Sequence, residues 1–173
     1  MARLDLRLLK LTLGDHRWER IDLDVEPFAA SSLTYAAAPQ TFTADLGITR
    51  LSEGMLFDLA FTTDVTGPCQ RCLDDAKLSI SVRGDEYQAT VPQGEGDSEV
   101  CEYLEGEILD VDRWARDAII LALPIVVVCK VGCAGLCARC GANLNAGLCA
   151  CPPPEPDPRW QALRGLELPS SDG

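Results

Sequence analysis

Hydrophobic and polar residues alternate along much of the first 90 residues, which is the pattern of strands with one buried face. The alternation is clearest over residues 21–25, 42–48, 59–65, 78–82 and 87–91. The leucines of residues 3–13 alternate with a slip in phase. A strand with a bulge near Leu8–Leu9 is expected there, and a helix is the alternative. The Ala- and Ser-rich segment from Pro27 to Pro39 is expected to be a loop or a short helix.

One segment, Val111 to Leu123, has the spacing of an amphipathic helix. Its apolar stripe consists of Trp114, Ala115, Ala118, Ile119 and Ala122. Asp110 suits the N-cap, Asp112 suits the first turn, and Pro124 ends the helix. The apolar run Ile125 to Val128 is expected to be a short buried strand that leads to Cys129.

Eight of the nine cysteines fall into four close pairs, and Cys101 is left over. Cys-x-x-Cys turns aim two thiolates at one point, and two such pairs complete a tetrahedral Cys₄ shell around Zn²⁺. The sequence therefore predicts two zinc ions per chain. The predicted ligands are Cys69, Cys72, Cys129, Cys133, Cys137, Cys140, Cys149 and Cys151.

Disulfides and iron–sulfur ligation are the alternatives to zinc at these cysteines. Charged residues interrupt the leucines of the N-terminus, so the sequence has no signal peptide pattern, and no stretch is long enough to span a membrane. We therefore expect a cytoplasmic protein, in which thiols stay reduced.

The cysteines can be divided between two ions in more than one way. Cys137, Cys140, Cys149 and Cys151 are close in sequence and resemble a zinc-ribbon-like hairpin. Short loop closure favours these four as one site. The second site then consists of Cys69 and Cys72, the two cysteines of CQRC, together with Cys129 and Cys133. The alternative pairs CQRC with Cys149 and Cys151. CQRC lies at an expected turn between two strands, where a metal-binding knuckle is usually found.

These elements predict an α+β protein with a mainly antiparallel β body, either a barrel or a sandwich, one helix and a small C-terminal zinc-ribbon-like module. The expected divisions are a body over 1–128 with the acidic stretch and the helix, and a cysteine-rich zinc module over 129–151. The module has few large apolar residues, so metal would have to stabilise it. Residues 152–173 form a Pro-rich spacer and a short terminal helix with Trp160, Leu163 and Leu166 on one stripe.

The chain has a formal net charge of −12, which disfavours binding to bare nucleic acid and favours a basic protein partner. Eight carboxylates and no base lie between Glu95 and Asp112. This stretch is either a solvated loop or a docking surface for a basic partner. The residues predicted to contact that partner are Glu99, Glu102, Glu105 and Glu107.

Catalytic motifs are weak in this sequence. It has no nucleophile elbow, phosphate loop, dinucleotide fingerprint or metalloprotease motif, and His16 is its one histidine. Acidic neighbours disfavour the thiolate of Cys101. The prediction is a protein that is not an enzyme and has no small-molecule substrate. A thiol oxidoreductase that uses CQRC and a metal-delivery protein are the alternatives.

Several segments together resemble a known family. They are CQRCL, the strand DEYQATV, the acidic stretch, the helix ending in IILALP, CKVGCAGLCARCGANLN, the CAC pair and DPRWQALRGL. In this order, from about Leu56 to Leu168, they resemble the YceD family, which is named for large ribosomal RNA subunit accumulation. The resemblance implies a factor in large-subunit biogenesis that is needed for normal levels of large-subunit ribosomal RNA.

Two mechanisms are open within this resemblance. The acidic stretch could bind a basic ribosomal protein or a pre-ribosomal particle, and the charge of the chain favours this mechanism. The cysteine-rich module could instead contact RNA weakly. The residues predicted for that contact are Lys130, Arg139, Asn143 and Asn145.

Overall fold

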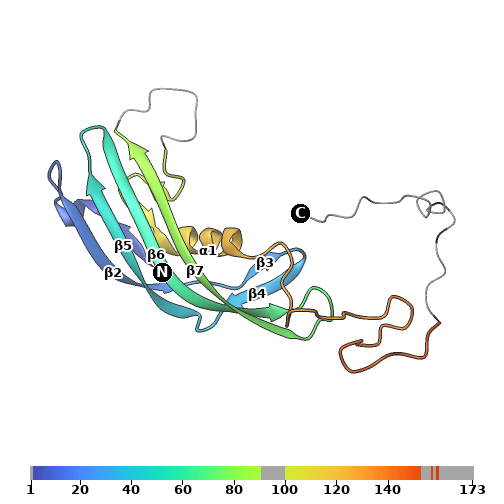
Figure 1. Cartoon of the computed structure of the whole chain (residues 1–173). Coiled ribbons are helices and arrows are strands. Elements are labelled where there is room, and N and C mark those ends of the chain that lie inside the picture. Colours follow the sequence, from blue (N-terminus) through green and yellow to red (C-terminus); the bar gives the residue numbers. More distant parts are fainter. Residues whose placement is uncertain (1, 91–99, 153–156, 158, 160–173) are drawn as a thin grey trace, which may run out of the picture.

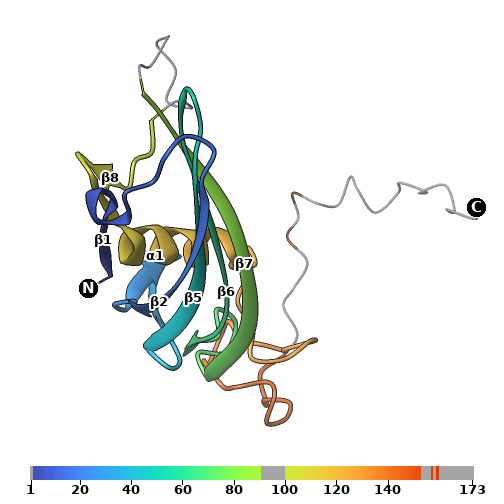
Figure 2. The same ribbon diagram turned by 90° about the vertical axis from the view of Figure 1, so that its left-hand side faces the viewer.

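The computed structural model describes residues 2–90, 100–152, 157 and 159, and its core is a curved antiparallel sheet that holds one helix on its concave side (Figures 1 and 2). The elements in chain order are β1 (Arg3–Asp5), the 3₁₀ helix η1 (Leu6–Leu9), β2 (His16–Asp24), β3 (Phe28–Ala30), β4 (Leu33–Ala37), β5 (Thr41–Arg50), β6 (Gly54–Pro68), β7 (Asp75–Ala89), β8 (Leu104–Glu105), β9 (Ile108–Asp110) and α1 (Val111–Ala122).

Strand β6 organises the large sheet. It pairs with β7 along its whole length, from Gly54 opposite Ala89 to Pro68 opposite Asp75. On its other side β6 pairs first with β5 and then with β4, and the order of the main path is β2-β5-β6-β4-β3. A second, three-stranded sheet has the order β1-β9-β8. The predicted class, mainly antiparallel sheets with one helix, is confirmed.

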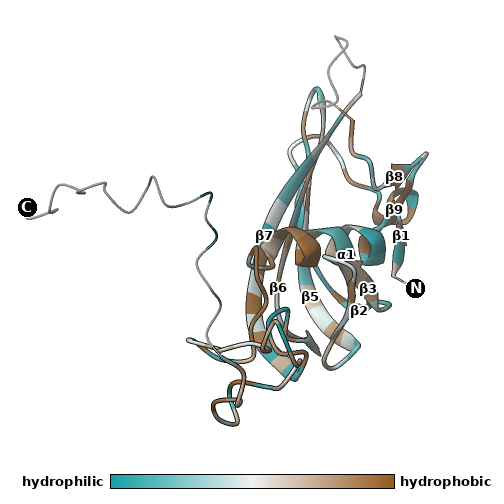
Figure 3. Ribbon diagram, turned by 90° about the vertical axis from the view of Figure 1, so that its right-hand side faces the viewer, coloured by the Kyte–Doolittle hydropathy of each residue, from teal (hydrophilic) through white to brown (hydrophobic). Residues whose placement is uncertain are grey.

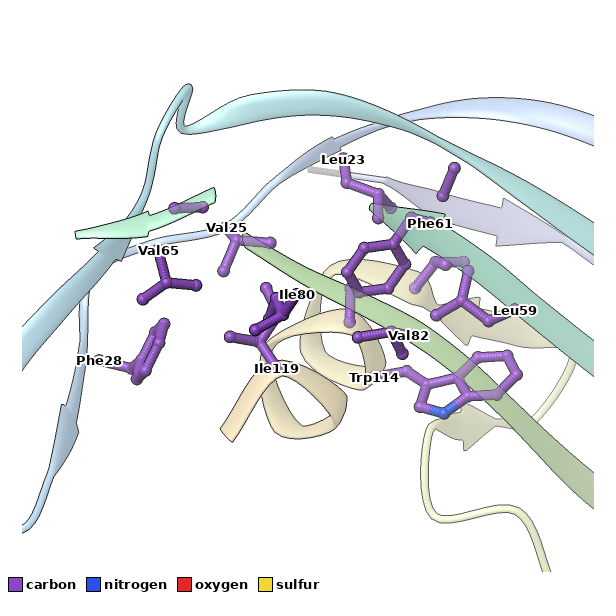
Figure 4. Close-up of a cluster of buried hydrophobic side chains, with 14 of the residues drawn as sticks. Leu23, Val25, Phe28, Leu59, Phe61, Val65, Ile80, Val82, Trp114 and Ile119 are labelled. Carbon is purple, nitrogen blue, oxygen red and sulfur yellow. The ribbon is translucent and has the colours of Figure 1, made fainter. Parts of the chain in front are cut away.

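The core forms where the alternating apolar faces of the strands meet the apolar stripe of α1. Leu23 of β2, Val25 directly after it, Phe61 of β6 and Val82 of β7 belong to the same buried cluster as Ile119 of the helix (Figure 4). Full burial of one such aliphatic side chain contributes about 1.5–3 kcal/mol. Two edge strands of the curved sheet, β2 and β7, both contact the helix.

Helix α1 begins and ends close to the predicted positions. Asp110 is the N-cap, and its carboxylate accepts a hydrogen bond from the backbone N–H of Arg113 at 3.1 Å. Asp112 accepts hydrogen bonds from the backbone N–H groups of Ala2 at 2.5 Å and Asp24 at 2.9 Å. Of the eight carboxylates of the acidic stretch, Asp110 therefore caps the helix, and Asp112 fixes the start of the helix to the N-terminal segment and the end of β2.

Three local predictions were wrong. Residues 3–13 form a three-residue strand and then a 3₁₀ helix, because the Asp5 carboxylate caps the N–H of Arg7 at 3.0 Å. The segment from Pro27 to Pro39 contains the hairpin β3–β4. Its turn residues Ser31 and Ser32 both have positive φ, as in a tight turn that matches the twist of a hairpin.

The third error concerns residues 125–128, which form no strand. Pro124 removes a backbone donor, and the segment runs as an irregular connection. Ile125 is 95% exposed, whereas Val127 is 2% exposed. The carbonyl of Val127 accepts a hydrogen bond from the N–H of Gln70 at 2.9 Å, which joins this connection to the turn that holds CQRC.

Some predictions are not tested by the fold. The terminal helix with Trp160, Leu163 and Leu166, most of the Pro-rich spacer, and the acidic residues Glu95, Asp97 and Glu99 lie outside the described residues. The domain boundaries stay a prediction. Within the described part of the chain, no helix has the length and apolar character needed to cross a membrane.

Candidate metal centres

The first cysteine cluster consists of Cys69, Cys72, Cys129 and Cys133. The first two lie in the turn between β6 and β7, as predicted, and the other two lie in the connection that follows α1. The Sγ atoms of all four lie within 4.8 Å of one another. The Sγ of Cys69 lies 3.8 Å from that of Cys133, and the Sγ of Cys72 lies 3.5 Å from that of Cys129. The cluster therefore joins segments about 60 residues apart in sequence.

Backbone hydrogen bonds shape this turn and attach the cysteine-rich segment to it. The N–H of Cys69 donates to the carbonyl of Asp74 at 2.8 Å, and the N–H of Leu73 donates to the carbonyl of Cys69 at 2.9 Å. The guanidinium of Arg71 donates to the carbonyl of Cys133 at 3.0 Å, and the N–H of Leu136 donates to the carbonyl of Arg71 at 3.1 Å. Arg71, a residue of CQRC that no prediction singled out, thus bridges the two segments.

The thiols of the first cluster differ in acidity. Burial raises the pKa of Cys69, but backbone N–H groups, including that of Arg71 at 3.4 Å, outweigh burial and lower this pKa to about 6. The side-chain amide of Asn145 is the main cause that lowers the pKa of Cys133. Burial raises the pKa of Cys72 and Cys129. N–H donors that stabilise a thiolate are the usual surroundings of a metal-binding cysteine.

The second cluster consists of Cys137, Cys140, Cys149 and Cys151, whose Sγ atoms also lie within 4.8 Å of one another. The N–H of Cys137 donates to the carbonyl of Ala142 at 2.8 Å, and its carbonyl accepts from the N–H of Gly141 at 2.9 Å. Gly141 has a φ of +71°, which suits glycine. The backbone N–H groups of Cys140 and then Arg139 lower the pKa of Cys137 to about 6. This cluster closes a local loop.

Both clusters fit a tetrahedral metal ion. A Cys₄ shell with Zn–S bonds of about 2.3 Å has sulfur atoms about 3.8 Å apart. In the first cluster the Sγ separations of 3.5 and 3.8 Å are close to this value and exceed the ~2.05 Å of a disulfide, and in the second cluster all four Sγ atoms lie within 4.8 Å of one another. The division of the cysteines is the one that short loop closure favours. Each cluster could hold one metal ion, and four cysteines would leave no coordination position open for a substrate.

Asn143 and Asn145, which were predicted to contact RNA, make hydrogen bonds within the chain. The side-chain amide of Asn145 donates to the Sγ of Cys133 at 3.4 Å, and its oxygen accepts from the N–H of Ala134 at 2.9 Å. The amide of Asn143 donates to the carboxylate of Asp74 at 2.7 Å. Because both asparagines lie in the loop of the second cluster, they connect that loop to the first cluster. The sequence pattern did not indicate this connection.

We expect Asn145→Ala to weaken metal binding at the first cluster by about 10- to 100-fold, the usual effect of removing a hydrogen bond to a metal ligand. The measurement is chelator competition on the purified protein. Leu148→Ala in the same loop is the control, because Leu148 is 98% exposed. Equal metal affinity in the Asn145 variant and the wild type would show that this amide does not support the site.

Metal retention should depend on pH. Cys69 and Cys137, with pKa values near 6, give each cluster at least one thiolate at neutral pH. Lowering the pH from 7 to 5 protonates the thiolates of these two residues. Protons compete with metal for thiolates, so the metal is then held less tightly. We expect the metal affinity of both clusters to fall by at least tenfold over this range. Titration with a metal-sensitive dye at each pH tests it, and an affinity independent of pH would contradict it.

Three glutamates of the acidic stretch are exposed at the small sheet. Glu102, Glu105 and Glu107 are all exposed on the hairpin β8–β9 or directly before it. None of the three carboxylates makes an ion pair with another described residue. Glu99, the fourth predicted partner-binding residue, lies outside the described residues. The three described glutamates are therefore available to a basic partner.

Three further residues singled out from the sequence are not ligands of either cluster. Lys130 and Arg139 are exposed on the cysteine-rich segment, and their predicted RNA contact stays a prediction. Cys101 is 1% exposed and belongs to neither cluster. Burial, and then the neighbouring carboxylate of Glu86, raises the pKa of Cys101, which agrees with its predicted weakness as a nucleophile.

Comparison with known proteins gives the chain a family context. A family model described as "Large ribosomal RNA subunit accumulation protein YceD" matches residues 57–167. An uncharacterized protein of Mycobacterium tuberculosis is 33% identical over 139 residues, which cover 74% of this chain and 63% of that protein. An uncharacterized protein of Mycobacterium leprae is 30% identical over 134 residues, which cover 72% of this chain and 58% of that protein.

A plant protein is similar over a shorter segment. The chloroplastic "Large ribosomal RNA subunit accumulation protein YCED homolog 1" of Arabidopsis thaliana is 36% identical over 58 residues, which cover 34% of this chain and 18% of that protein. The chain thus spans less than two thirds of the length of these relatives. No solved structure matches it.

Proposed function

Because the chain belongs to the YceD family, we propose that it is a non-enzymatic factor in large ribosomal subunit biogenesis, needed for the accumulation of large-subunit ribosomal RNA. The observation that carries this proposal is the family match over residues 57–167, which includes all eight clustered cysteines. The name of the plant relative, which refers to the same accumulation, supports it. A cytoplasmic location remains part of the proposal.

The metal ions in this proposal are two structural Zn²⁺ ions. Zinc suits the donor set, because four thiolates at tetrahedral separations are its usual structural site. Each ion would be bound by cysteines alone, which suits a stabilising role better than a catalytic one. The exposed residues Val131 and Leu148 support the need for metal, because the segment that contains them buries little apolar surface.

The proposed partner is a basic ribosomal protein or a pre-ribosomal particle that presents one. Glu102, Glu105 and Glu107 are exposed close together in sequence, and the whole chain has a net charge of −12. An exposed ion pair contributes only about 0.2–1 kcal/mol, so the acidic surface would act mainly through faster encounter and choice of partner. Binding should weaken as salt is added, because the Debye length is about 8 Å at physiological ionic strength.

Contact with RNA is the weaker mechanism of the two. Lys130 and Arg139 are exposed, but they are the only basic residues of the segment 129–151. Phosphate binding needs several clustered cations. The side chains of Asn143 and Asn145, which would have added hydrogen-bond donors for RNA, bind within the chain instead.

The proposal is tested by capture of partners from cells at low salt, with both protein and RNA identified. We expect the wild-type chain to retain a basic large-subunit protein, and added salt to release it. The same capture after ribonuclease treatment separates a direct protein contact from one mediated by RNA. Recovery of ribosomal RNA without any basic protein would contradict the proposed partner and favour the RNA mechanism.

A further inference from the structure

Strand β7 forms an edge of the large sheet and has no partner on its outer side among the described residues. It pairs with β6 over 15 residues in a continuous register and with no other described strand (Figure 1). An edge strand offers a row of backbone N–H and C=O groups that a second chain can pair with. Proteins usually shorten, bulge or cover such edges. The length and regularity of β7 make its open edge a candidate docking element.

A groove of about 440 Å³ runs between this edge and α1. Its β7 wall consists of the consecutive residues Ser81–Glu86, and its helix wall includes Trp114, Ala118 and Leu121. Leu121 is 84% exposed, and the end of α1 that lies next to β7 consists of hydrophobic residues (brown in Figure 3). The groove thus combines an open strand edge with an apolar wall.

Gly84 creates part of this space. It lies on the inward-facing row of β7, between Val82 and Glu86, where the alternation would otherwise place a side chain. A Cβ atom at Gly84 would lie 3.7 Å from Nε1 of Trp114, so a small side chain fits and a larger one would fill the groove. Glycine in a strand weakens it, and often marks a place where another backbone approaches closely.

Trp114, which lies beside β7 in Figure 4, lines the groove and carries an unused hydrogen-bond donor. The residue is 3% exposed, and its indole N–H makes no hydrogen bond with any described residue. No polar side-chain atom in the described part of the chain is both fully buried and without a partner, so this N–H must reach the groove. An indole N–H is a donor only, and a backbone carbonyl is the acceptor that an added strand would offer.

Four carboxylates and three guanidinium groups lie at or beside the groove, and more of the carboxylates than of the guanidinium groups lack an ion-pair partner among the described residues. Burial, and then the carboxylates of Glu102 and Asp85, raises the pKa of Glu86. Burial, and then Asp117, Glu86 and Glu102, raises the pKa of Tyr103, which lines the same groove. Three guanidinium groups lie near these carboxylates. Arg83 lines the groove, Arg113 lies over the ring of Tyr103, and Arg116 is paired with Asp117. Asp85, Glu86 and Glu102 have no ion-pair partner among the described residues.

We propose that the open edge of β7 over Ser81–Glu86, with the groove beside α1, binds an extended basic segment of the partner as an added strand. The basic character of the occupant rests on the function proposed above, and the mode of binding rests on the edge, the groove and the indole N–H. Six residues of strand span about 20 Å. Main-chain hydrogen bonds to β7 would give affinity, and alternate basic side chains on the inward face would meet Glu86, which lies on the same row as Val82 and Gly84.

The test uses the full chain with its metal and two synthetic ten-residue peptides. One alternates Lys or Arg with Val or Thr, and the other has Glu at each basic position. We expect the basic peptide to bind and to slow hydrogen exchange of those amides in Ser81–Glu86 that face away from β6. The acidic peptide should not bind. No binding of the basic peptide, protection elsewhere only, or β7 amides already protected in the free protein would overturn the proposal.

Variants locate the binding and separate this proposal from the function it rests on. Gly84→Val should weaken binding of the basic peptide at least tenfold, and Glu86→Gln should weaken it several-fold. Neither substitution should change the metal content. Thr43→Val, an exposed position on β5 away from the groove, is the control. If the wild type captures a basic ribosomal protein and both groove variants capture it equally well, strand addition is wrong and the proposed function stands. If the wild type captures none, the proposed function fails.

Discussion

Replacing Cys69 with serine is expected to release the metal of the first cluster and to free residues 129–136 from the turn between β6 and β7. Structural zinc supplies about 10–16 kcal/mol of apparent binding free energy at neutral pH, far more than this segment gains by burial. Of its apolar side chains, Val131 is fully exposed. Hydrogen exchange resolved by segment should show loss of protection in 129–136 and in the turn, with the core strands unchanged.

Cys149→Ser should have a different and more local effect. The second cluster closes a loop within residues 137–151, so its loss should melt mainly the cysteine-rich segment and leave the turn of CQRC protected. Each variant should retain one of two metal ions. Cys101→Ser is the control for removal of a buried thiol outside both clusters, and it should keep both ions. Identical patterns of lost protection in the Cys69 and Cys149 variants would contradict the division of ligands.

The second large effect is expected from neutralising the acidic surface. Changing Glu99, Glu102, Glu105 and Glu107 to Gln should abolish binding of the basic partner and lower large-subunit ribosomal RNA in cells that lack the native protein. The physical reason is the loss of four negative charges from one surface, which removes the field that attracts a cationic chain. Metal content should not change, because these residues are remote in sequence from every clustered cysteine.

The control carries the same change in net charge at other exposed positions. Asp22, Glu26, Glu53 and Asp75 are exposed and lie outside the acidic stretch. Their amide variants together should keep partner binding and ribosomal RNA at wild-type levels. If the glutamine variant of the acidic stretch also supports normal RNA levels, that stretch is only a solvated surface. Contact with RNA through Lys130 and Arg139 would then become the better mechanism.

The sequence predicted those features of the fold that depend on local periodicity. Alternation identified the long strands, and the 3.6-residue stripe with Asp110 and Pro124 located the helix within one residue. The hairpin β3–β4 was missed because Ser31 and Ser32 adopt positive φ, a conformation that Asn or Gly usually signals. Apolar composition alone suggested burial of Ile125, which the structure exposes.

In the candidate site, too, the features that depend on residues close in sequence could be predicted, and those that depend on distant segments could not. Short loop closure predicted the second cluster directly from cysteine spacing, and the first cluster followed as the four paired cysteines that remained. The roles of Arg71 and Asn145 depend on the docking of the cysteine-rich segment against the turn of CQRC. No periodicity or motif encodes that docking. The groove beside β7 likewise follows from the packing of α1 against an edge strand.

The most direct test of the two metal centres is elemental analysis of the freshly purified protein, combined with titration of its thiols. We expect close to two zinc ions per chain, with Cys101 as the one cysteine that is free of metal. Chelation of the zinc should make eight further thiols reactive. Protein that contains no zinc, or whose cysteines are fully oxidised to disulfides, would contradict the claim that two Cys₄ zinc centres stabilise the cysteine-rich segment and attach it to the β body.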